Sequence, residues 1–144
     1  MTAAFSNPID AFLLGHHVMS LAVSADGRPW AASVFYVPDL AARRLLFFTA
    51  ASTRHGDALI RTGAVAAAIA GQERDIARLC GLQIEGHASM LEGDAAAAAQ
   101  TAFIAAFPEI AGMTAPLWAL SPSMIKLTDN AKGFGHKEVW QKQT

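Results

Sequence analysis

The sequence predicts a mainly β domain of the α+β class, a six-stranded antiparallel barrel with a few short helices. Segment 82–91 alternates strictly between apolar and polar side chains, which is typical of an antiparallel strand with one face in a core. Five further apolar segments of strand length are separated by turn residues or helical stretches, and a sheet of this size avoids open edges by closing. The six strands are expected at 18–24, 30–37, 45–49, 65–70, 82–91 and 118–128.

Capping residues predict a short helix at the start of the chain. Ser6 or Asn7 can cap a helix whose first position is Pro8, and Gly15 follows its last turn. The first two strands then form a hairpin, because an Asp-Gly turn lies between them. Pro38 is expected to stop the second strand, since proline cannot donate to a β-ladder.

A strand, a helix and another strand follow the hairpin. The run 45–49 is apolar except for its last residue, and hydroxyl residues then open a helix at 53–62. Asp57 and Arg61 are one turn apart in this helix and can form an i,i+4 ion pair. The short apolar run 65–70 is expected to be the fourth strand.

The C-terminal part predicts two long strands around one alanine-rich helix. The alternating strand 82–91 is followed by a helix that starts at Gly93-Asp94 and ends before Pro108. A loop then leads to a long strand at 118–128, which Pro122 interrupts. The glycine-punctuated tail 129–140 is expected to be irregular.

Composition narrows the class of partner. The formal net charge is −1, with 11 Lys and Arg against 12 Asp and Glu, so no basic field favours a nucleic acid or an anionic membrane. The longest apolar runs are too short to span a bilayer, and the N-terminus does not resemble a secretory signal. The one cysteine, Cys80, excludes an intrachain disulfide and a multi-thiolate metal site. We therefore expect a cytoplasmic protein.

A hydroxyl-rich basic turn predicts the main binding site. Ser52, Thr53, Arg54 and His55 bring hydroxyls, a guanidinium and an imidazole to the start of a helix, where backbone N–H groups are free. These are the groups that bind a phosphate. The small side chains of 31–33 on the neighbouring strand allow a flat ring to approach the backbone. The sequence thus predicts a phosphorylated planar ligand.

The order of these segments carries a family resemblance. The hairpin, the strand 45–49, the basic turn with its helix, and the Ile-Glu-Gly strand at 84–86 resemble the pyridoxamine-phosphate-oxidase-like FMN-binding split barrels. The tail, with 125–130, 133–135 and Trp140, is similar to a small uncharacterised bacterial subgroup of that superfamily. The resemblance implies that residues 1–144 form a single FMN-binding split-barrel domain.

The resemblance also implies which residues contact FMN. The phosphate contacts would be Thr53, Arg54 and His55, and Ser52 before them is a further candidate for cofactor binding. The aromatic-Thr pair before this turn is Phe48-Thr49, and the strand beneath the flavin ring is Ala32, Ser33 and Val34. The family usually dimerises with a flavin between subunits, so the contacts from the second chain would be Gln83 and Trp118. His55 stands where the family usually has lysine, so its charge depends on the bound phosphate.

The function implied is an FMN-binding flavoprotein, an oxidoreductase of unknown small-molecule substrate that acts as a homodimer. No side chain is identified as an obligatory acid or base, and no catalytic residue is assigned. A non-catalytic module that binds flavin, haem or deazaflavin stays open, as does a structural dimer without cofactor. No metal site is expected, because His16 and His17 would point to opposite faces of a strand and lack a third ligand.

Overall fold

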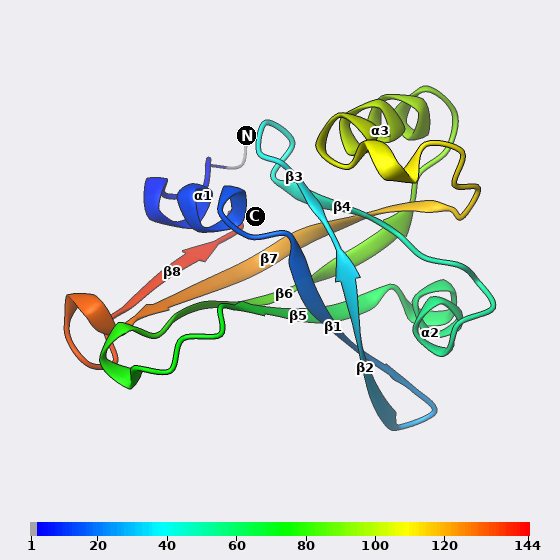
Figure 1. Ribbon diagram of the computed structural model, residues 1–144. Coiled ribbons are helices and arrows are strands. Elements are labelled where there is room, and N and C mark those ends of the chain that lie inside the picture. The colour runs from blue at the N-terminus through cyan, green and yellow to red at the C-terminus, as the bar shows by residue number, and fades with distance from the viewer. Residues whose placement is uncertain (1–2) are drawn as a thin grey trace.

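The computed structural model describes residues 3–144 as one curved antiparallel sheet with three α-helices (Figure 1). The strands are β1 (Val18–Ala25), β2 (Arg28–Phe35), β3 (Val37–Asp39), β4 (Arg44–Phe48), β5 (Ala64–Ala70), β6 (Cys80–Met90), β7 (Leu117–Asp129) and β8 (Lys137–Gln141). The α-helices are α1 (Asn7–Leu14), α2 (Arg54–Thr62) and α3 (Gly93–Ala106). Short 3₁₀ turns are η1 (Ile76–Arg78), η2 (Pro108–Ile110) and η3 (Asn130–Lys132).

The chain connectivity forces the sheet to curl. The strand order is β2-β1-β5-β6-β7-β4-β3, with β8 added on β7. The two ends of this order, β2 and β3, are separated in the chain only by Tyr36. Tyr36 is buried, its N–H donates to the carbonyl of His17 over 2.9 Å, and its hydroxyl donates to the carbonyl of Leu13 over 2.8 Å. The predicted mainly β, antiparallel barrel architecture is therefore confirmed, as a half-barrel.

Side-chain alternation produces two apolar cores. Along β1 and β5, every second residue is buried inside the curved sheet, as period-2 geometry requires. The inner core is closed by α1, through Ile9 and Leu13. A second cluster lies on the outer surface, where Phe103 of α3 packs with Leu46 and Ala119. This outer cluster fixes α3 beside β4 and β7, and so builds one wall of the site described below.

The structure has eight strands where six were predicted. The predicted strand 30–37 is divided, because the chain bends at Tyr36 and Pro38 lies within the short edge strand β3. Proline is tolerated there because an edge strand leaves one row of N–H groups unpaired. The tail predicted as irregular contains β8, whose Trp140 is buried against Phe5 with ring centroids 4.7 Å apart. A strand of five residues with only one of them in the core leaves little pattern in the sequence from which it could be predicted.

The predicted interruption of β7 is present as a shift in register. Pairing between β6 and β7 shifts between Glu85 and Gly86, because Ser123, which follows Pro122, has no partner on β6. The predicted hairpin of β1 and β2 is also found, with Asp26 at φ 55° and Gly27 at φ 71° in its turn. Within residues 3–144, no helix is both long and apolar enough to cross a lipid bilayer.

Candidate functional site

The start of α2 presents unpaired backbone donors. Thr53 caps the helix: its hydroxyl accepts a bond from the N–H of Gly56 over 3.0 Å and donates to the carbonyl of Ala50 over 2.8 Å. Gly56 is required at this position, because a Cβ there would overlap the carbonyl oxygen of Ala50. The N–H groups of Arg54 and His55 precede the first intrahelical bond. This helix start is therefore suited to an anion.

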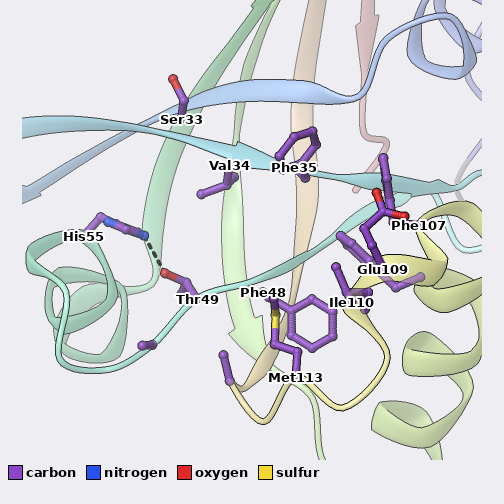
Figure 2. A pocket seen from close by; sticks show the side chains of 13 residues that line it. Ser33, Val34, Phe35, Phe48, Thr49, His55, Phe107, Glu109, Ile110 and Met113 are labelled. Carbon is purple, nitrogen blue, oxygen red and sulfur yellow. Dashed lines mark hydrogen bonds between the residues drawn. The ribbon is translucent and has the colours of Figure 1, made fainter.

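A cavity of ≈ 390 Å³, here called the apolar pocket, opens beside this helix start (Figure 2). Its polar end is formed by Thr49, Ala50 and His55, between β4 and α2. Its apolar wall comes from β2, β4 and the α3–η2 region, and consists of Val34, Phe35, Phe48, Phe103, Phe107, Ile110 and Met113. The pocket is thus polar at one end and aromatic along its length.

Aromatic packing orders the far wall of the pocket. Phe103 contacts Phe48 edge-on at a centroid distance of 4.8 Å and lies 5.5 Å from Phe107. Phe107 in turn lies 5.4 Å from Phe35 of β2. Such edge and tilted contacts are favourable for aromatic rings and restrict their motion. A planar ligand would therefore meet a rigid surface.

At the polar end, His55 and Thr49 are hydrogen-bonded through the imidazole Nε2 and the hydroxyl (Figure 2). Thr49 is only 6% exposed, so this bond satisfies a buried polar group. Burial lowers the pKa of His55 below its ordinary value, which leaves the imidazole neutral at pH 7. A bound phosphate would act in the opposite direction and favour the charged ring.

A second cavity, of ≈ 320 Å³, lies on the other side of the α2 start and is here called the arginine groove. It is formed by the turn end of the β1–β2 hairpin and by α2, with Asp26, Arg28, Trp30, Arg54, Asp57 and Arg61 in its lining. The guanidinium of Arg54 lies 4.2 Å from the centroid of the Trp30 ring, within the range of a cation–π contact. The start of α2 is thus flanked by a mainly apolar cavity and by a charged one.

Comparison with known proteins identifies the family. The sequence profile of pyridoxamine 5′-phosphate oxidase matches residues 5–128. The chain belongs to the pyridoxamine 5′-phosphate oxidase family. A UPF0306 protein of Yersinia pestis is 39% identical to this chain over 134 residues, which are 93% of this chain and 91% of that protein.

Similarity to solved structures supports the fold. The heme binding protein from Mycobacterium smegmatis gives a TM-score of 0.77 at 22% identity, over 96% of this chain and 59% of that chain. This chain therefore spans about three fifths of that chain. An FAD-binding protein from Mesorhizobium loti gives a TM-score of 0.67 at 14% identity, over 88% of this chain and 96% of that chain.

The structure brings together five of the eleven residues that were predicted to bind a cofactor. Around the apolar pocket these five are Ser33, Val34, Phe48, Thr49 and His55. Val34 points toward the pocket and Ser33 away from it (Figure 2). Phe48, Thr49 and His55 thus lie around the same pocket as part of β2, the strand that was predicted beneath the flavin ring.

The structure places the other six predicted residues outside that lining. Arg54 lies in the arginine groove, the Thr53 hydroxyl is used in the helix cap, and Ser52 is exposed in the turn. Ala32 is half-buried on β2, between Trp30 in the groove and Ser33 at the pocket. These residues stay candidates for cofactor contact, since none of their placements tests binding.

The two residues predicted to reach the cofactor of a second chain are not part of the pocket lining. Gln83 is exposed on β6, where it pairs with Lys126 of β7. Trp118 is 3% exposed, and its ring stacks with Phe47 at a centroid distance of 6.4 Å. The assignment of both to an intersubunit contact stays a prediction.

Sequence reasoning missed the α3–η2 wall. Phe103 and Phe107 lie in the helix predicted to end before Pro108, and Ile110 and Met113 lie in the predicted loop, but none of them was predicted as part of a site. Apolar residues spaced through a loop directly after an apolar helix stripe could have indicated a second wall. Among residues 3–144, no cluster of three or more His, Cys, Asp or Glu side chains has the arrangement of a metal site.

Proposed function

We propose that the chain is a flavoprotein that binds FMN in the apolar pocket and acts as a flavin-dependent oxidoreductase. The observation that carries the proposal is the pocket itself, which joins a phosphate-type helix start to an aromatic wall. Membership of the pyridoxamine 5′-phosphate oxidase family supports the same ligand class.

The phosphate fits the polar end. The N–H groups of Arg54 and His55 are free of intrahelical acceptors, and the Thr49 hydroxyl is bonded to the imidazole of His55. The absence of a Cβ at Gly56 keeps the loop at Ala50 close against the helix start. The guanidinium of Arg54 would contact a phosphate at this helix start while it stays on the ring of Trp30. These residues would bind and orient the phosphate without taking part in electron transfer.

The ring system fits the apolar end. Val34 and Phe48 offer surface on either side of the pocket, and Phe103 with Phe107 closes its outer wall. When bound, flavin supplies the transfer of electrons, and the chain supplies orientation and exclusion of water. Glu109 at the rim is the one carboxylate in this lining, so it would repel an anionic substrate.

The proposed assembly is a homodimer in the cytoplasm. Leu14, Val18 and Phe35 are 63%, 41% and 56% exposed near the open side of the sheet, and apolar exposure of this size suits a second copy. The lone thiol of Cys80 suits a reducing compartment. A second copy covering Phe35 would close the pocket from the β2 side.

Haem is the second candidate ligand. His55 is a neutral imidazole at the end of an aromatic pocket, which is the state and surrounding in which an imidazole binds haem iron. The Thr49 hydroxyl occupies Nε2, so iron would need Nδ1 or a broken hydrogen bond. FMN is preferred because the helix start offers phosphate donors that haem does not use.

Titration of the purified protein with FMN and with haem tests the proposal. Quenching of flavin fluorescence at one FMN per chain is expected, and it should weaken in Thr49→Val and His55→Ala. His136→Ala removes an exposed histidine of the tail and is the matched control. Haem binding that is lost in His55→Ala, together with no flavin binding, would replace FMN by haem.

A further inference from the structure

The arginine groove is a continuation of the apolar pocket along the same two elements. On β2, Trp30 lines the groove and Ser33 the pocket, three residues further along the strand. On α2, the neighbouring residues Arg54 and His55 line the groove and the pocket respectively. A ligand that passes over the start of α2 would therefore reach both cavities.

The charges of the groove are incompletely paired. Arg61 forms ion pairs with Asp26 over 2.9 Å and with Asp57 over 3.1 Å, and these three side chains together carry a charge of −1. With Arg28 and Arg54 included, the charged side chains of the lining sum to +1. In the part of the chain that the structure describes, Arg28 and Arg54 form no ion pair with a carboxylate. Two guanidinium groups are thus left to bind an anion.

The groove also offers a stacking platform. Trp30 is 46% exposed, although it is one of the largest apolar side chains, and Arg54 already covers part of its ring. A guanidinium stacked on an indole is a flat, polarised layer that accepts a further aromatic ring. Phosphate-binding cations beside such a layer are the features by which proteins hold a nucleotide.

We propose that the arginine groove binds the adenosine monophosphate half of a flavin dinucleotide, so that the chain prefers FAD to FMN. The second phosphate would contact Arg28 and Arg54, and the adenine would stack on the Trp30–Arg54 pair. This inference rests on the proposed function, because it extends the flavin from the apolar pocket. It assigns a binding role to Arg28 and Trp30, which lie outside the pocket lining.

Affinities for FAD and FMN, measured side by side by flavin fluorescence, test the inference. FAD is expected to bind at least about 10-fold more tightly than FMN, because stacking of the adenine adds to the affinity. Trp30→Ala and Arg28→Ala should remove most of this preference and leave FMN affinity within about twofold, whereas Trp30→Phe should keep it. Arg74→Ala, which removes an exposed arginine far from α2, is the matched control.

The outcomes separate this inference from the proposed function. Equal affinity for the two flavins, or a preference that survives both Trp30→Ala and Arg28→Ala, overturns the role of the groove while flavin binding stands. If neither flavin binds, the proposed function fails, and a titration with ADP then decides the groove. Because Trp118 and Trp140 are 3% and 8% exposed, quenching by ADP would come mainly from Trp30, and no quenching overturns the inference.

Discussion

The apolar pocket and the arginine groove share one helix start but are assembled in different ways. The groove is built from two short segments, 23–30 and 54–61, which the hairpin and α2 bring together. The pocket needs β2, β4 and the distant α3–η2 region, and its wall depends on the outer core cluster. Binding of a ring in the pocket thus depends on the packing of α3 against the sheet, whereas the groove needs only the β1–β2 hairpin and α2.

The largest effect is expected from Phe103→Ala, which should change binding in the pocket and leave binding in the groove unchanged. Phe103 is 2% exposed and lies between the outer core and the pocket, so its truncation should lower the free energy of unfolding by about 3–5 kcal/mol. FMN affinity should fall with it, while binding of ADP in the groove should change little. Denaturant unfolding and the two titrations measure these quantities, with Thr101→Ala on the exposed face of α3 as control.

Arg54→Ala is expected to affect both regions, because Arg54 stands between them. The loss of FMN binding should be about 1.5–3 kcal/mol, the usual contribution of a hydrogen bond to a charged group. Arg54→Lys should recover part of the phosphate contact but not the stacking on Trp30. An FMN affinity in Arg54→Ala equal to that of the unchanged protein would contradict the phosphate assignment.

The third prediction is a pH dependence confined to the pocket. Because burial lowers the pKa of His55, its contribution to folding stability is complete above the ordinary value of 6.5 and is lost as pH falls from there toward the lowered value. A bound phosphate raises the same pKa, so FMN affinity should increase by roughly fivefold between pH 8 and 6.5, about 1 kcal/mol for a charge-assisted bond.

His55→Gln keeps a hydrogen-bonding side chain but cannot be protonated. Its FMN affinity should therefore be flat over the same pH range, and its stability should not decline below pH 6.5 through this position. Isothermal titration calorimetry at several pH values provides the measurement. A slope retained in His55→Gln would assign the pH dependence to another group.

The smallest effect is expected at the rim of the pocket. Glu109→Gln removes an exposed carboxylate from the lining, and FMN affinity should rise by about twofold, because exposed charges contribute less than about 1 kcal/mol. The gain should shrink in high salt, since screening reduces interactions between exposed charges. A loss of affinity in this variant would mean that Glu109 accepts a bond from the ligand.

The local features of the fold were predictable from the sequence. The helix opened by hydroxyl residues, the Asp-Gly turn and the alternation of segment 82–91 all depend on neighbours in the chain, and the structure contains each of them. The ion pair of Asp57 and Arg61 was also predicted and is present at 3.1 Å. The strand β8 was missed because one buried residue, Trp140, is too short a pattern to show a period.

Only the part of the candidate site that is built from neighbouring residues of the chain was predictable from the sequence. The turn that leads from Thr49 to His55 follows from residue types and spacing, whereas the positions of Phe103 and Met113 depend on how α3 packs on β4 and β7. The direction of the Arg54 side chain could not be predicted from the sequence either, because its contact with Trp30 joins two elements that are distant in the chain.

The visible absorption spectrum of the purified protein, before and after incubation with FMN and removal of free ligand, tests the central claim most directly. A retained flavin spectrum with one flavin per chain is the predicted result, and it should be reduced in Arg54→Ala but not in Arg74→Ala. A protein that stays colourless after incubation with FMN, or that takes up haem alone, would contradict flavin binding in the apolar pocket.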